Sequence, residues 1–354
     1  MNLEFPESYY LQNQKSGRID GHNSNYRSGS QRIPRKVRYE IHVILQNHRE
    51  KSARSEKSVG YGTQEKRSTI ILGFFSDLFF LKYKIESVRN LKQKHLRAVF
   101  HFLEAEGQAP ATLQNKISVI RTFCEWIGKD DMVKDSKKYV RDARSVRRTT
   151  VAQEDRSWNG KGFDAVEKIE QIRMEDGNVA VWLELCWAFG LRVQEAVMLR
   201  PVSAHEENHL QIRDGTKGDR ARLVPIENFV QEDVLERAKK MADQKNGWIG
   251  PRGKTVQQKL RRLYYVMEKC GVNLAGDGIT AHGLRHQYMQ ESYKRLMGVD
   301  SPIKGGNINE VSNEDFYSGT LKLVERAGHS RTTIGASYYG SRRRKGSPKS
   351  EQPK

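Results

Sequence analysis

The residues Ala281-His282-Gly283-Leu284-Arg285-His286 form the stretch that says most about how this chain folds and acts. They open a segment that we expect to be helical over 283–297. Because residues i and i+3 share a helix face, His282 and Arg285 can converge on one anion. A histidine pair also suggests a metal, but no cysteines or acidic cluster surround it, so the sequence predicts no metal site. Each residue taken singly is more often structural.

A second short motif lies upstream, in Gly190-Leu191-Arg192-Val193-Gln194-Glu195. An apolar helix is expected over 179–189 and ends at Gly190, and a new helix is expected to begin at Arg192. The spacing places Arg192 and Glu195 on one helix face. On its own, such a pair is usually a surface ion pair.

Between these motifs the sequence predicts a β-hairpin. Residues 209–214 and 221–226 have the pattern of two short strands, joined by Gly215-Thr216-Lys217-Gly218-Asp219. A lysine in such a turn is normally solvated. A two-stranded hairpin is also rigid, however, and it could hold the Lys217 ammonium against a leaving oxygen.

The last motif lies near the C-terminal end of the sequence. Gly328-His329 is followed, nine residues after the histidine, by Tyr338, with Tyr339 beside it. Paired tyrosines in such a place most often serve packing. Each of the four motifs is a weak signal by itself, but their combination in this order is a strong one.

Helical patterns dominate the rest of the chain, which predicts a mainly α fold with a small antiparallel β-hairpin, in the α+β class. The helical region before residue 150 could, on its pattern alone, be any small helical bundle. The expected parts are a basic, flexible N-terminal arm over 1–58, a helical domain over 59–150, a linker over 151–162, a second domain over 163–345 and a C-terminal tail over 346–354.

The charge balance favours a polyanionic partner. Lys and Arg number 62 against 43 Asp and Glu, which gives a formal net charge of +19. Neutralising phosphates releases condensed counterions, so such an excess suits nucleic acid, although ribosomal and membrane-surface proteins share it. The basic run 134–158 shows little apolar periodicity and fits either a solvated linker or a segment lying along a DNA backbone. Its candidate DNA-binding residues are Lys137, Lys138, Arg141, Arg144, Arg147 and Arg148.

Cysteine usage and hydropathy exclude two classes of protein. Cys124, Cys186 and Cys270 are widely spaced, which indicates neither a disulfide scaffold nor a zinc site and fits a reducing compartment. The most apolar run, 70–81, is too short to span a bilayer and contains Asp77. No secretory signal is recognisable, so we expect no membrane association.

Taken together, the four motifs resemble those of the tyrosine recombinases, also called phage integrases. That family has an Arg after Gly-Leu with a Glu three residues on, a Lys in a β-hairpin, His-x-Leu-Arg-His, Gly-His, and a Tyr nine residues after that His. The resemblance covers about 163–345, as a catalytic domain, and the preceding helical domain looks like the family's SAM-like core-binding domain. An excess of length before His329 suggests a loop insertion over 298–320. The matching residues are, in order, Arg192, Glu195, Lys217, His282, Arg285, His286, His329 and Tyr338.

The resemblance implies a site-specific DNA recombinase in which Tyr338 attacks a phosphodiester, forms a 3′-phosphotyrosine and releases a 5′ hydroxyl. Charge builds up on phosphorus oxygens in the transition state, and Arg192 and Arg285 can clamp those oxygens while His282 and His329 add hydrogen bonds. By the same resemblance, Lys217 is the general acid, Glu195 orients the arginines and His286 supports the site. Neither ATP nor another cofactor is implied.

As partners, the resemblance implies double-stranded DNA with specific sites, a homotetramer on paired sites, and accessory DNA-bending or directionality factors. It implies a role in integrating or excising a mobile element, and a cytoplasmic, nucleoid-associated place in a bacterial cell. Two alternatives stay open. A type IB topoisomerase shares the chemistry but rejoins the same strand, and a DNA-binding protein with a decayed site would bind without cutting.

Overall fold

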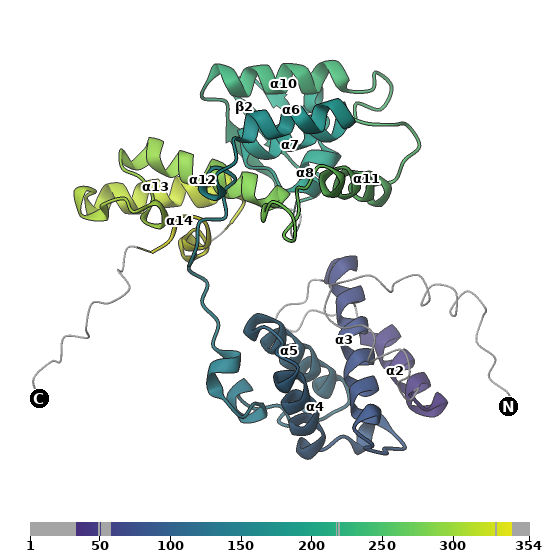
Figure 1. Ribbon diagram of the computed structural model, residues 1–354. Coiled ribbons are helices and arrows are strands. Elements are labelled where there is room, and N and C mark those ends of the chain that lie inside the picture. Colours follow the sequence, from purple (N-terminus) through teal and green to yellow (C-terminus); the bar gives the residue numbers. More distant parts are fainter. Residues whose placement is uncertain are drawn as a thin grey trace, which may run out of the picture. The chain divides into compact units, whose positions relative to one another are not determined.

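The computed structural model describes residues 33–48, 50, 58–216, 218, 220–329 and 331–341. The chain divides into two compact units, Met1–Arg148 and Thr149–Lys354, each described here by itself (Figure 1). Most of the expected arm, the tail over 346–354 and Lys217 lie outside the described residues. The described fold is mainly helical with a small antiparallel sheet, which confirms the predicted class. Within these residues, no helix has both the length and the apolar composition that crossing a bilayer requires.

The first unit is a helical bundle with an aromatic centre. Its α4 buries Leu96, Val99, Phe100 and Leu103 at the spacing expected for one helix face. Phe75 of α3 packs edge-on against Phe123 of α5, with ring centroids 5.5 Å apart. The bundle consists of α2 (Arg35–His48), α3 (Tyr61–Phe80), α4 (Gln93–Ala105) and α5 (Pro110–Trp126).

Helix α2 belongs to this bundle, although the sequence placed all of 1–58 in a flexible arm. Val37, Ile41 and Leu45 recur every four residues and are buried against the rest of the unit. Glu40 also accepts hydrogen bonds from the Ser87 hydroxyl and the Val88 amide, both at 2.8 Å. The helical unit therefore starts well before residue 59, because this short stretch has an apolar face to bury.

The basic run after α5 is also held to the first unit over most of its length. It forms two 3₁₀ turns, Ser136–Tyr139 and Ala143–Val146, and Tyr139, Val140 and Val146 are buried in the unit's core. The Tyr139 hydroxyl donates to the Met132 carbonyl at 2.9 Å. The expected absence of apolar anchoring is therefore wrong for 136–146. All six candidate DNA-binding residues of the run are exposed.

The second unit is organised around α7 (Gly177–Phe189). This helix is apolar on all sides, so it is buried on all sides and packs against several neighbours. Helix α12 (Ala281–Met297) packs on α7 and also on α13 and α14. The other helices are α6 (Ala165–Glu175), α8 (Val193–Met198), α9 (Pro201–Ala204), α10 (Phe229–Met241), α11 (Val256–Lys269), α13 (Asn313–Arg326) and α14 (Ala336–Tyr339).

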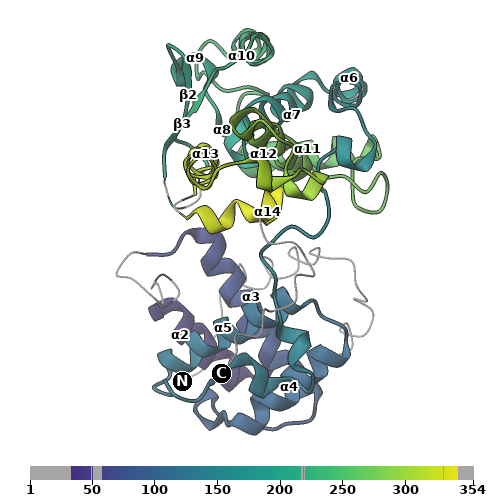
Figure 2. The same cartoon turned by 90° about the vertical axis from the view of Figure 1, so that its left-hand side faces the viewer.

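The sheet lies at the edge of this unit, beside α9 and α13 (Figure 2). Its strands β1 (His205–Glu206), β2 (His209–Ile212) and β3 (Arg222–Pro225) are antiparallel in the order β1-β2-β3. In the β2–β3 register Leu210 faces Val224 and Ile212 faces Arg222, and all four side chains are buried. An arginine thus occupies an inward position of the sheet.

Two predicted boundaries differ from the structure. Ser157 and Trp158 lie within the expected linker over 151–162, yet both are buried in the second unit, and the Trp158 indole N–H donates to the Thr280 carbonyl at 2.8 Å. The expected loop insertion over 298–320 is irregular only up to Ser312, because α13 begins at Asn313. The Ser312 hydroxyl accepts from the Asp315 amide at 3.0 Å and caps that helix.

Candidate active site

The C-terminal end of α13 brings two predicted arginines together. The Ala327 carbonyl oxygen accepts a hydrogen bond from Arg192 Nη2 at 3.2 Å and another from Arg285 Nη2 at 2.6 Å. The last carbonyls of a helix lack partners within the helix and carry the negative end of its dipole, so they favour cations. Gly328 follows with φ +66°, a left-handed conformation that suits glycine. The two guanidinium groups therefore meet at one backbone oxygen.

Arg285 is fixed on every side. It is completely buried, and it donates from Nη1 to the Gly190 carbonyl and from Nε to the Tyr338 hydroxyl at 3.1 Å. Loss of solvation lowers its pKa, the nearby Tyr338 ring raises it and Arg192 lowers it further. A guanidinium has five N–H donors, so two remain for an oxyanion after these three bonds.

Arg192 is held by Glu195, the partner that the sequence predicted. Glu195 Oε1 accepts from Arg192 Nη1 at 2.6 Å, and Oε2 accepts from the Arg192 backbone amide at 2.8 Å. Glu195 is fully buried, which by itself would raise the pKa of its carboxyl, but hydrogen bonds and charge from Arg222 and Arg192 lower that pKa to about 2. Glu195 is therefore ionised, and it orients Arg192 from inside the protein.

Tyr338 meets the arginines through its hydroxyl. This oxygen lies 3.1 Å from Arg285 Nε and 3.3 Å from His329 Nε2, and the residue is almost fully buried. The Gln290 side-chain amide donates to the Tyr338 carbonyl at 3.3 Å and to Asp155 Oδ1 at 2.8 Å. The short helix α14 thus points this tyrosine into the site and is held from α12.

Tyr339 points elsewhere. Its ring packs 5.0 Å from that of Tyr293, and its burial raises the pKa of its hydroxyl. Neighbouring residues of a short helix face about 100° apart, which is why one tyrosine enters the site and the other enters the core.

The two histidines of α12 flank Tyr338. The ring centroids of His282 and His286 lie 5.9 and 4.9 Å from that of Tyr338. Loss of solvation and then the charge of Arg285 lower the pKa of His282 to about 4, although the exposed side chain lets solvent screen part of this effect. Burial and then His282 lower the pKa of His286 to about 3, and His286 Nδ1 has no hydrogen-bond partner among the described residues. Both rings are therefore neutral near pH 7.

Lys217 lies outside the described residues, and the last described stretch before it ends at Thr216. Gly215, with φ +73°, passes so close to α8 that an added Cβ would lie 2.9 Å from the Gln194 carbonyl oxygen. Gly215 therefore packs against the start of α8. The structure thus brings together all the predicted site residues of the second unit that it describes, Arg192, Glu195, His282, Arg285, His286, His329 and Tyr338.

The sequence reasoning missed two residues of this neighbourhood. Arg222 of β3 donates to both oxygens of Glu195, at 2.9 and 2.7 Å, and Gln290 holds the helix of Tyr338 as described above. In β3, Arg222 and Val224 point inward and Leu223 points outward. The position of Arg222 two residues before the inward Val224 was the signal available in the sequence. Gln290 had no signal beyond its helical register with His286.

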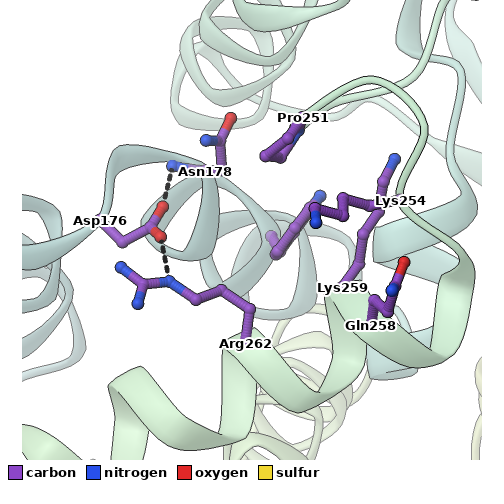
Figure 3. A pocket seen from close by; sticks show the side chains of 8 residues that line it. Asp176, Asn178, Pro251, Lys254, Gln258, Lys259 and Arg262 are labelled. Atoms are coloured by element: carbon purple, nitrogen blue, oxygen red, sulfur yellow. Dashed lines mark hydrogen bonds and ion pairs between the residues drawn. The ribbon is translucent and has the colours of Figure 1, made fainter.

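A separate hollow of about 250 Å³ lies between the start of α7 and α11 (Figure 3). Asp176 there accepts hydrogen bonds from the Asn178 amide at 3.0 Å and from Arg262 Nε at 2.8 Å, and Lys259 donates to the Ile249 carbonyl at 2.9 Å. None of the predicted site residues lines it.

In the described part of the chain, no group of three His, Cys, Asp or Glu side chains could hold a metal ion.

Comparisons with known proteins agree with this arrangement. Residues 145–291 match the family described as Integrase, and residues 46–133 match the one described as Phage integrase, N-terminal. The tyrosine recombinase XerC of Staphylococcus carnosus is 25% identical over 265 residues, which cover 70% of this chain and 87% of that protein. The XerC of Corynebacterium efficiens is 23% identical over 222 residues, 61% of this chain and 69% of that one.

Two solved structures are similar in fold. A lambda integrase dimer bound to a COC′ core site aligns with a TM-score of 0.55 at 14% identity, covering 88% of this chain and 80% of that one. The XerH recombinase in a post-cleavage complex with a palindromic difH substrate aligns with a TM-score of 0.53 at 16% identity, covering 79% and 76%.

Proposed function

The chain belongs to the tyrosine recombinase, or phage integrase, family of enzymes that break and rejoin DNA, and we propose that it exchanges strands between specific sites through a phosphotyrosine on Tyr338. The contact of the Tyr338 hydroxyl with Arg285 Nε and His329 Nε2 supports this most directly. It joins the attacking oxygen to a group that binds phosphate. We further propose that the exchange integrates or excises a mobile element.

The first step forms one bond and breaks another. Tyr338 Oη passes its proton to His329 Nε2, 3.3 Å away, and attacks phosphorus. The bond from phosphorus to the 5′ oxygen breaks, and that oxygen leaves as a hydroxyl while the 3′ phosphate stays on the tyrosine. Lys217 supplies the leaving group's proton. The phosphotyrosine keeps the energy of the broken bond. A 5′ hydroxyl of a second duplex can therefore attack the phosphotyrosine, release Tyr338 and join the two strands.

Charge stabilisation falls to the two arginines. Arg285 has two N–H donors beyond its protein contacts, and the Arg192 side chain has three beyond its bonds to Glu195 and Ala327. These donors are fixed before the phosphate arrives, which is what makes such stabilisation effective in the transition state. His282, which is neutral near pH 7, and His329 add hydrogen bonds beside them.

DNA is the proposed partner, bound as paired sites by a tetramer. The lambda integrase relative was solved as a dimer on a core site, and the XerH relative on its difH substrate. The net charge of +19 favours the same partner.

A capture experiment tests this function without knowing the target. The chain is incubated with sheared genomic DNA that contains its own gene, covalent adducts are collected after denaturation in detergent, and the attached DNA is sequenced. We expect one short sequence to be enriched, in an adduct that protease digestion removes. Capture of random sequence, together with relaxation of a supercoiled plasmid in a parallel assay, would favour the topoisomerase alternative. Binding without any adduct would favour a decayed site.

A further inference from the structure

Arg222 is a buried arginine that the chemistry described so far does not use. It begins β3, directly after the hairpin tip, and its side chain is 4% exposed. Its Nη1 and Nη2 donate to the two oxygens of Glu195 at 2.9 and 2.7 Å, and its Nε donates to the Arg326 carbonyl at 2.7 Å. The guanidinium thus reaches from the sheet to α8 on one side and to the end of α13 on the other.

Both of these contacts lead to Arg192. Glu195 holds the Arg192 side chain and backbone amide, and Arg326 immediately precedes Ala327, whose carbonyl oxygen binds Arg192 and Arg285 together. Gly328 follows, and an added Cβ there would lie 3.2 Å from Arg222 Cδ. Arg222 therefore contacts both supports of the arginine pair without facing the phosphate position itself.

The charges explain why an arginine is needed here. Glu195 is fully buried, and burial alone would favour its neutral form. The charged and titratable groups that act on it are Arg222, Arg192 and the Cys186 thiol of α7. The buried side chains of α11, which packs on α8, are Leu263, Val266, Met267 and Lys259, and Lys259 donates to the Ile249 carbonyl. Arg222 lowers the pKa of Glu195 more than any other residue does.

We propose that Arg222 is a positioning residue for strand cleavage: it keeps Glu195 ionised and aligned, so that Glu195 and the end of α13 hold Arg192 where the phosphate binds. This inference rests on the proposed function. A positioning role for Arg222 differs from that of an ion pair that only stabilises the fold. Loss of Arg222 would change the cleavage rate on bound DNA and make that rate depend on the protonation of Glu195.

The test compares Arg222→Met and Arg222→Lys with a matched control, Arg237→Met. Arg237 donates to the buried Glu184 from Nε and Nη2 at 3.1 and 2.7 Å. In Arg237→Met, Glu184 would still pair with a second arginine, Arg173, at 2.8 Å, just as Glu195 would still pair with Arg192 in Arg222→Met. The control therefore removes the same kind of contact from the same unit, away from Tyr338. Single-turnover cleavage is measured on a nicked duplex of the captured site, which releases the cut fragment, and DNA affinity is measured alongside.

We expect Arg222→Met to cleave bound DNA roughly tenfold to a hundredfold more slowly, with affinity changed far less. Its rate should fall further as the pH is lowered from about 8 to about 5, because the pKa of Glu195 rises without Arg222. The wild type and Arg237→Met should lack that added fall. Arg222→Lys, which keeps the charge, should cleave at a rate between those of Arg222→Met and the wild type. If Arg222→Met does not fold, Arg222→Lys takes its place in the test.

The double variant Glu195→Gln with Arg222→Met should lose the added pH dependence, because Gln does not titrate. An unchanged rate in Arg222→Met, or a slower rate with the wild-type pH profile, would overturn the inference. If the wild type forms no adduct on any DNA, the proposed function fails by itself. A carbon-13 NMR titration of the Glu195 carboxyl then still decides the inference, since Arg222→Lys and Arg222→Met must raise its pKa.

Discussion

Arg285 Nε and the Tyr338 hydroxyl are in direct hydrogen-bond contact, 3.1 Å apart. The arginine precedes the tyrosine by 53 residues along the chain, and α12 and α14 pack together to join them. The proposed nucleophile thus rests on the group that is proposed to bind the phosphate. An incoming phosphate would meet both at once.

Arg192 and Arg285 are predicted to act mainly on the transition state. Arg285→Lys and Arg192→Lys keep the charge but lose the planar fork that binds two oxygens. We expect the rate of cleavage on bound DNA to fall by about a hundredfold or more, with affinity weakened far less. Lysine is preferred to alanine because alanine at the buried Arg285 would remove its hydrogen bond to the Gly190 carbonyl and one of the two hydrogen bonds to the Ala327 carbonyl. Loss of binding with an unchanged rate on bound DNA would make these arginines positioning contacts for DNA only.

Cleavage is predicted to need no divalent metal, because fixed guanidinium donors supply the charge stabilisation that a metal would otherwise give. Adduct formation by purified protein should proceed at the same rate in excess chelator as in added magnesium. Adduct that forms only when magnesium is added would contradict the arginine-based mechanism.

His286 is predicted to reduce stability in acid. Its pKa in the folded chain, about 3, lies below the ordinary value of 6.5, so the unfolded chain binds more protons between these values. The free energy of unfolding should therefore decrease as the pH falls from about 6.5 towards 3, at up to about 1.4 kcal/mol per unit. His286→Phe should flatten this dependence in urea titrations at several pH values, whereas substitution of the exposed His209 should not. Equal slopes in both variants would contradict the assignment.

The basic residues 141–148 are predicted to contact phosphates and not bases. Each phosphate contact adds about 0.9 to the magnitude of the slope of log affinity against log salt. Replacing Arg141, Arg144, Arg147 and Arg148 by Gln should lower that slope by roughly two to four units, with base preference little changed. Arg144 already pairs with Asp142 at 2.8 Å on the surface, a weak contact that DNA can replace. An unchanged slope across a salt series would leave these residues as surface charges only.

The residues that meet at the candidate site could be predicted from sequence because each sits in a short motif with fixed spacing. Arg192 with Glu195 and His282 with Arg285 are neighbours along the chain, so helical geometry alone places them. The support beneath them could not be predicted in this way. The Ala327 carbonyl is a backbone atom that no residue type announces, and Arg222 reaches Glu195 only through the β2–β3 register.

Two errors came from composition. Residues 36–48 fall within the arm expected over 1–58, where apolar residues mixed with many charges suggest at most a short helix, yet Val37, Ile41 and Leu45 have the four-residue spacing of a buried face. Asn313, Glu314 and Asp315 were assigned to a loop because polar residues cluster there. Ser312 with acidic residues in the next turn is also the signature of a helix start, and α13 begins there.

The central claim, that Tyr338 is the nucleophile, is tested most directly by locating the covalent bond. Adduct trapped on a nicked duplex of the captured site is digested with trypsin, and the modified tyrosine is identified by mass spectrometry in the wild type, Tyr338→Phe and Tyr339→Phe. The structure predicts a phosphotyrosine at Tyr338 in the wild type and in Tyr339→Phe, and no adduct in Tyr338→Phe despite retained DNA binding. An adduct on Tyr339, or full cleavage by Tyr338→Phe, would contradict the account.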